Sequence, residues 1–205
     1  LRVVVVRSLI NQMMNVRMSD ILQKESAPCM NASTGYSSFT ATKDVFMATA
    51  TAKTGQALPA LEMLLTESKR MQQFGFTPSE LERAKANFLR SVESQYLDRE
   101  KQEHNSFVWD YFSHFTNNEP ACDIEYFKDF SKEVVPGISI EEINAIASQF
   151  VTDKNIIISL TAPDQKDIQV PDTTQLLAVY DKVKNMTVTG YENQLTATSL
   201  METLP

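Results

Sequence analysis

The feature that most constrains the fold is one stretch of strict alternation between two long segments of helical period. In residues 45–53 successive side chains alternate between two faces: one face has Val45, Met47, Thr49 and Thr51, and the other has Phe46, Ala48, Ala50 and Ala52. Alternation with a period of two predicts a strand with two different faces. The uncharged residues 29–39 supply a partner strand, and Lys43-Asp44 supply a turn. We therefore expect a β-hairpin that packs one face on helices.

Helical period accounts for most of the remaining chain. Apolar residues recur at helical spacing in residues 2–25, 56–74, 77–102, 103–117, 123–134, 139–150 and 173–185. A β-branched run at 155–161 is typical of a buried strand. This order of elements predicts an α+β fold with two layers, in which helices cover one face of a few-stranded, mostly antiparallel sheet.

Several helix ends are marked by capping residues. Gly75 follows the second helical segment, at the position where a left-handed residue ends a helix at low cost. Thr77, Pro78 and Glu80 then form a capping box with proline in the first turn. Ser139 and Glu142 predict a second box. These signals separate the helices at 75–77 and at 137–139.

The composition excludes several classes of active site. The five glycines are scattered, so neither a dinucleotide fingerprint nor a phosphate-binding loop is present. The two histidines, His104 and His114, lie ten residues apart and cannot form the HExxH or HxxEH motif of zinc peptidases. No GxSxG elbow is present for a serine hydrolase. A metal site from both histidines with Asp110 is an alternative, but packing or capping is the commoner role of such residues.

Charge and hydropathy argue against a nucleic acid or a membrane as the partner of this chain. A net charge of -7 argues against a nucleic-acid surface. No apolar run is long enough for a membrane span, and the short run at 3–6 is too short for a signal peptide. Cys29 and Cys122 show no CxxC spacing, and they are either two buried thiols or one disulfide, with buried thiols the commoner outcome. We do not expect Cys29 to be a nucleophile, because no histidine or aspartate is near it in sequence.

Three further features each allow two interpretations. Arg17 lies on the apolar face of the first helix, where a contact within the domain is expected more than a contact to substrate. The aromatic residues 107–115 form either a partner-binding face or part of the core, and the core is expected. The polar strand 31–38 is either a solvated surface or an edge open to peptides by strand addition.

Three stretches together resemble the pitrilysin/insulinase metallopeptidases, the inverzincin family. They are LINQMMNVRMSDILQKESAP at residues 9–28, the hairpin with VFMATATAK followed by GFTPSELERAKANFLRSVES at residues 75–94, and SIEEINAIASQFVTDKNIIISLTAPD at residues 139–164. The resemblance covers roughly residues 2–185, and the ordered set carries it more than any one motif. It implies the repeated α+β domain of these proteases.

The resemblance also implies a role. One domain of such proteases carries HxxEH and a distant glutamate, which bind zinc and activate water, while sister domains keep the fold without those residues. This chain therefore resembles a non-catalytic domain at residues 1–185, followed by an extended linker at residues 186–205. The expected parent is a bacterial zinc protease whose catalytic domain, zinc and peptide substrate are the partners. The chain does not begin with Met, and we expect it to be a segment of that longer protein.

One departure from the family pattern identifies candidate residues. Some non-catalytic domains present an arginine and a tyrosine to substrate after the first helix. Here Gln23 stands near the arginine position, and Cys29 or Met30 near the tyrosine position. These three residues are the substrate-chamber candidates, although the expected pair itself is absent. No catalytic residue and no metal ligand is assigned in this segment.

Two rival functions and one location follow from the same pattern. A structural subunit of the same fold, with no peptidase role, is the main alternative. An independent enzyme with an unrecognised site is the other, and zinc analysis with a peptide-cleavage assay tests it. The family resemblance favours the bacterial periplasm or cell envelope over the cytoplasm.

Overall fold

The structure is a computed structural model that describes residues 1–205 except 41, 102–103, 118–120, 153, 164–168 and 193–205. In chain order its elements are α1 (Arg2–Leu22), β1 (Cys29–Thr40), β2 (Lys43–Ala52), α2 (Ala57–Phe74), α3 (Pro78–Leu97), the 3-10 turn η1 (Arg99–Lys101), α4 (His104–Asn117), α5 (Ile124–Val134), the 3-10 turn η2 (Val135–Gly137), α6 (Ile140–Ala147) and α7 (Thr173–Asn185). The expected α+β class is confirmed.

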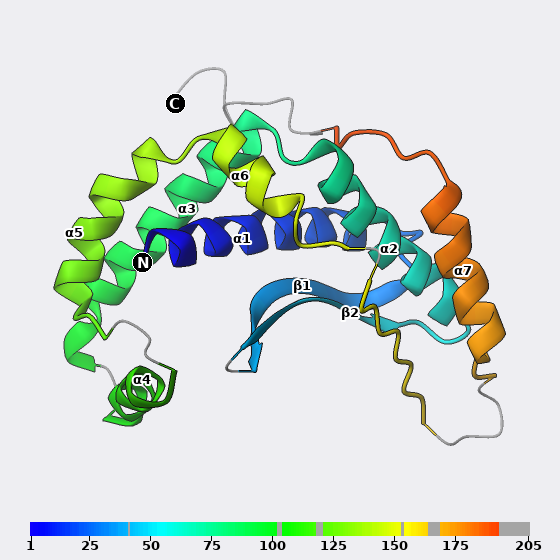
Figure 1. Ribbon diagram of the computed structural model, residues 1–205, viewed down its shortest axis with the longest axis horizontal. Coiled ribbons are helices and arrows are strands. Elements are labelled where there is room, and N and C mark those ends of the chain that lie inside the picture. The colour runs from blue at the N-terminus through cyan, green and yellow to red at the C-terminus, as the bar shows by residue number, and fades with distance from the viewer. Residues whose placement is uncertain (41, 102–103, 118–120, 153, 164–168, 193–205) are drawn as a thin grey trace, which may run out of the picture.

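Helix α1 is the centre of the domain. Its buried side chains come in adjacent pairs four residues apart: Val5, Val6, Leu9, Ile10, Met13, Met14, Arg17 and Met18. This spacing makes a broad buried face, as expected for a helix enclosed by neighbours. Figure 1 shows α1 lying along the hairpin, with α2 and α7 toward one end and α3 and α5 side by side at the other.

The hairpin has the two faces that the alternation predicted. Strands β1 and β2 pair antiparallel, with Gly35 opposite Met47 and Tyr36 opposite Phe46. Phe46 and the alanines of β2 are half-buried, whereas Met47 and the threonines are exposed. The ring of Phe150 stacks on Tyr36 at 3.9 Å between centroids, which ties the chain after α6 to this inner face.

Two asparagines of α1 take the place of a neighbouring strand along β1. Asn15 donates to the Thr34 carbonyl and accepts from the Thr34 amide, both at 2.9 Å. Asn11 does the same for Tyr36, at 3.2 and 2.9 Å. Because the amide side chains occupy the outward donors and acceptors of these residues, the alternative of a β1 edge open to peptides is wrong at both positions.

The expected buried strand at 155–161 is absent. Within the described residues the sheet contains β1 and β2 alone, and Ile157 is 90% exposed. A β-branched composition shows that side chains fit a pleated surface, but a strand also needs a partner for its backbone groups. Here the run continues as irregular chain after Asn155, whose φ of 59° breaks the extended conformation.

Helix α4 also differs from expectation. Its aromatic side chains are exposed: Phe107, Trp109, Tyr111, Phe112 and Phe115, the last by 89%. The interpretation of residues 107–115 as core is therefore wrong, because α4 stands away from the packed helices (Figure 1). The period of the apolar residues correctly predicted the helix, but a period carries no information on which surface covers it.

Side-chain caps mark the starts of several helices. Thr77 and Glu80 form the predicted box at α3, and Asp172 with Gln175 forms another at α7. At α6, Ser139 accepts from the Glu142 amide, but the Glu142 carboxylate pairs with Arg2 Nη2 at 2.6 Å instead of closing a box.

A candidate pocket beside the Arg17–Glu80 ion pair

The turn between α2 and α3 positions a backbone carbonyl and a carboxylate that contact α1. Gly75 ends α2 with a φ of 64°, as its position predicted, and a Cβ there would overlap the side chain of Asn144. Asn144 accepts from the Phe76 amide at 2.7 Å and donates to the Phe76 carbonyl at 3.1 Å. The turn is thereby bound to α6, and the Gly75 carbonyl is directed at α1.

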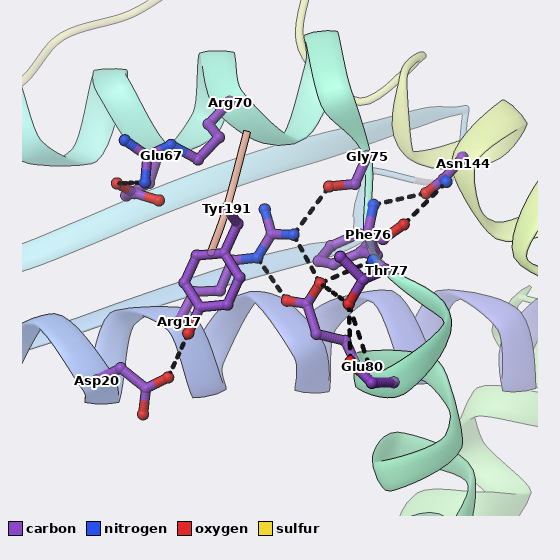
Figure 2. Close-up of polar contacts among 11 residues, drawn as sticks. Arg17, Asp20, Glu67, Arg70, Gly75, Phe76, Thr77, Glu80, Asn144 and Tyr191 are labelled. Carbon is purple, nitrogen blue, oxygen red and sulfur yellow. Dashed lines mark hydrogen bonds and ion pairs between the residues drawn. The ribbon is translucent and has the colours of Figure 1, made fainter. Parts of the chain in front are cut away.

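A buried ion pair joins α1 to this turn. Arg17 Nε and Nη2 donate to the two carboxylate oxygens of Glu80 at 2.7 and 2.9 Å, and Nη2 also donates to the Gly75 carbonyl at 2.8 Å (Figure 2). Arg17 is 0% and Glu80 4% exposed. This geometry confirms the expected role of Arg17 as a contact within the domain.

Glu80 stays ionised in this setting. Burial would raise its pKa, but the hydrogen bonds and charge of Arg17, with the amide and hydroxyl of Thr77, outweigh burial and hold the pKa below its ordinary 4.5. The same carboxylate thus caps α3 and neutralises Arg17.

The chain after α7 crosses over this pair. We call residues 187–192 the strap. Lys69 of α2 fixes its start by donating to the carbonyls of Val183, Lys184 and Met186 at 2.8, 2.8 and 2.6 Å. The strap then buries Val188. These residues belong to the linker expected at 186–205, and they pack on the domain; residues 193–205 lie outside the described chain.

Tyr191 closes the strap over Arg17. Its ring centroid lies 4.4 Å from the Arg17 guanidinium carbon, opposite Phe76 at 4.6 Å. Its hydroxyl donates to Asp20 Oδ2 at 2.5 Å. Burial, and then the hydrogen bond to Asp20, raise the pKa of Tyr191 to about 12. Tyr191 therefore remains a neutral donor at physiological pH.

A pocket of about 610 Å³ opens between α1, α2 and the strap. The charged residues that line it are Asp20, Lys24, Glu62, Glu67, Arg70 and Glu192. Glu67 is 5% exposed and meets Arg70 Nη1 at 3.2 Å. Burial raises its pKa against the lowering effect of the charges of Arg70, Arg17 and Lys24.

The three substrate-chamber candidates fall in different places. Gln23 is exposed at the end of α1 and lines the pocket. Cys29 is buried, and its thiol lies 3.8 Å from the sulfur of Met63. Met30 is exposed on β1 and does not line the pocket. The structure thus brings Gln23 alone to this site, and the chamber role of all three stays a prediction.

The two cysteines differ in burial, although both were expected to be buried thiols. Cys29 is a buried thiol and forms no disulfide, as expected. Cys122 is exposed, so the expectation of a second buried cysteine is wrong. The distance between Cys29 and Cys122 in the sequence carries no information on whether either side chain is buried.

Sequence reasoning missed Glu67 and Tyr191. A signal existed for Glu67, because it follows Ala60 and Leu64 at helical spacing and precedes Met71 on the same buried face of α2. A charged residue in such a stripe indicates a buried, partnered group. Tyr191 lies in a threonine-rich segment without period and carries no comparable signal.

The charged and polar side chains of the pocket could bind a ligand. Among the described residues, no group of three or more His, Cys, Asp or Glu side chains could hold a metal ion. His114 lies exposed on α4, and the side chain of His104 lies outside the described part. No helix of the described chain is long and apolar enough to cross a bilayer.

Solved structures with the same fold indicate the class of protein that this chain resembles. The architecture is that of a domain of the insulinase-type proteases, as the sequence resemblance predicted. No model of a protein family matches the chain. Since the identities to solved structures are low, these likenesses show the fold alone.

Two of the similar solved structures are of one bacterial enzyme. The periplasmic protease PqqL from Escherichia coli superposes with a TM-score of 0.73 and 17% identity, over 96% of this chain and 22% of that one. The first half of the same protease gives a TM-score of 0.70 at 17% identity, over 91% and 40%. A predicted insulinase family protease from Yersinia pestis gives 0.65 at 9% identity, over 87% and 38%.

One curated relative is similar in sequence. It is a zinc protease PQQL-like protein from Arabidopsis thaliana, 28% identical over 94 residues. The match covers 46% of this chain and 10% of the relative. The chain thus corresponds to a small part of the proteins it resembles.

Proposed function

We propose that this chain is a non-catalytic domain of a zinc-dependent metalloendopeptidase of the pitrilysin/insulinase type. In this proposal residues 1–185 form the domain, and residues 186–205, whose first part packs on it as the strap, lead to a following one. The domain forms one wall of the substrate chamber and supports the catalytic domain. The observation that carries the proposal is a protease-domain fold in a sequence whose two histidines cannot form HxxEH.

Hydrolysis in this proposal belongs to another domain of the same protein. There, zinc supplies the Lewis acid and lowers the pKa of the attacking water. This chain contributes a rigid scaffold, in which the Arg17–Glu80 pair ties α1 to the α2–α3 turn. We further propose an extracytoplasmic compartment, because the similar PqqL protease of Escherichia coli is periplasmic.

The coding sequence around this chain gives the first test. An HxxEH motif followed by a glutamate some tens of residues later supports the proposal. Its absence throughout the full reading frame contradicts it and favours the alternative, a structural subunit of the same fold without a peptidase role. The exposed aromatic face of α4 is compatible with either assembly.

A biochemical test separates the same alternatives. The purified 205-residue chain is assayed for zinc and for cleavage of a fluorogenic peptide library, alone and with the HxxEH-bearing fragment of its full protein. We expect no zinc in the chain, and faster cleavage by the fragment when the chain is added. The matched control is a fragment in which the glutamate of HxxEH is replaced by glutamine. Stoichiometric zinc and cleavage by the chain alone would show an independent enzyme.

A further inference from the structure

The pocket beside Glu67 carries an excess of negative charge. Four carboxylates line it, from Asp20, Glu62, Glu67 and Glu192, against the two cationic side chains of Lys24 and Arg70. Glu62 has an external partner, since Lys182 of α7 lies 2.6 Å from its Oε1. Asp20 accepts from Tyr191 through Oδ2.

Within the described part of the chain, Glu67 is the carboxylate of the pocket with a buried oxygen left without a hydrogen-bond partner, and Nε of the neighbouring Arg70 is likewise unpartnered. One oxygen, Oε1, meets Arg70 Nη1, while the buried Oε2 has no hydrogen-bond donor among the described residues. Figure 2 shows the Glu67 carboxylate extending from α2 toward α1, with the Arg70 side chain beside it. A buried carboxylate oxygen without a donor has lost its hydration, and no hydrogen bond replaces it. A donor brought by a ligand would remove that cost.

The walls suit an aliphatic stem that ends in a charge. Ile21 of α1 and Met63 of α2 supply apolar surface, and the Tyr191 ring adds a face. Thr66 and Gln23 add polar groups at the sides. Long basic side chains bury their methylenes against such surfaces and place the charged head against acidic groups.

We infer that this pocket binds a cationic group on an aliphatic stem, namely the guanidinium or ammonium of an arginine- or lysine-like side chain. The cation donates to Glu67 Oε2, and Arg70, at the pocket wall with 22% of its side chain exposed, turns outward to make room. The group is carried either by a peptide or by a small free amine. The peptide source rests on the proposed protease role, whereas the cation chemistry does not.

Binding is measured by amide chemical shifts of the ¹⁵N-labelled chain in three titrations. The probes are a blocked pentapeptide with one arginine between glycines, the same peptide with neutral citrulline, and agmatine. We expect the arginine peptide to shift amides around Glu67, and the citrulline peptide to bind about tenfold more weakly. Agmatine that binds as well as the peptide identifies the free amine as sufficient, and weaker agmatine binding identifies the peptide. Equal binding of citrulline, or no binding of any probe, overturns the inference.

Two substitutions test the pocket itself. Glu67→Gln removes the accepting charge and should weaken binding of the arginine peptide about tenfold. Glu82→Gln on the exposed face of α3 should leave the affinity for this peptide unchanged. Lys24→Glu removes a competing cation at an exposed position and should tighten binding, which a misfolded variant could not do. Unchanged binding in Glu67→Gln or Lys24→Glu overturns the inference. The zinc and cleavage assays are independent of these readouts, so the proposed function and the pocket can fail separately.

Discussion

At the residue scale, the domain depends on an arginine and a glutamate that are both withdrawn from water. Two hydrogen bonds join Arg17 to Glu80, and the rings of Phe76 and Tyr191 lie against the guanidinium. Removing one partner of such a pair leaves an uncompensated buried charge, whereas exposed ion pairs contribute little. The consequences of substitution at Glu80 and at the neighbouring Glu82 should therefore differ sharply.

Glu80→Gln should lower the free energy of unfolding by ~3–5 kcal/mol, because Arg17 would stay buried without its counter-charge. Glu82, whose side chain is 71% exposed, provides the matched control, and Glu82→Gln should change stability by less than ~0.5 kcal/mol. Urea unfolding followed by circular dichroism measures both. A loss at Glu80 no larger than at Glu82 would contradict the role assigned to the buried pair.

The same pair predicts an acid dependence of stability. The folded state holds the pKa of Glu80 below its ordinary 4.5, so the unfolded chain takes up this proton first as the pH falls. The stabilisation is therefore complete above about pH 4.5 and is lost as the pH drops through the lower, folded-state pKa. Unfolding free energies across the acid range should fall less steeply in Glu80→Gln than in the unsubstituted chain. If the unfolding free energies of the two proteins fell equally steeply with decreasing pH, the stabilising role assigned to ionised Glu80 would be contradicted.

At the element scale, α1 performs a task that a third strand performs in most sheets. Asn11 and Asn15 lie one helical turn apart, and each reaches both outward backbone groups of one β1 residue. An isolated two-stranded hairpin is marginal in water. The asparagine amides stabilise it by extending its hydrogen bonding onto the helix.

Asn15→Ala should cost about 1–3 kcal/mol, because the amide and carbonyl of the buried Thr34 lose their partner. Native-state hydrogen exchange gives a position-specific readout. Exchange should accelerate at Thr34, while the amide of Gly35, which points toward β2, serves as the internal control. If Thr34 and Gly35 accelerate equally, the substitution has loosened the whole hairpin and the strand-like role of Asn15 is not supported.

At the scale of the whole molecule, the exposed aromatic face of α4 is the largest departure from a self-contained domain. Five aromatic side chains of one helix are exposed, and patches of this kind on soluble proteins mark interaction surfaces. The chain superposes on only 22% of the protease PqqL from Escherichia coli.

The single tryptophan of the chain reports on that face, since Trp109 lies on α4 and is 61% exposed. Its fluorescence emission and its quenching by acrylamide should be close to those of the urea-unfolded chain. Addition of the HxxEH-bearing fragment should shift the emission to the blue if the fragment covers α4. A blue-shifted, poorly quenched signal in the dilute chain alone would show that α4 is already packed, contrary to the structure.

The parts of the fold that were predictable depend on local chemistry. The hairpin faces, the capping box at Thr77, the glycine at the end of α2 and the α+β class all follow from residues within a few positions of one another. The absence of the two histidines of an HxxEH motif is likewise a property of the sequence alone. Of the three substrate-chamber candidates, Gln23 alone lines the pocket, and its chamber role stays a prediction.

The remaining features required the tertiary structure, because burial and pairing depend on groups distant in sequence. Glu67 became an incomplete acceptor only when α1 and the strap enclosed it, and Arg17 found its partner 63 positions away. Residues 155–161 have a strand composition but no strand partner, and α4 has a core composition but no covering surface. The sequence by itself determined the helices, the hairpin and the absence of an HxxEH motif. The tertiary structure decided which of those elements meet, and hence where the pocket lies and which charge in it is left for a ligand.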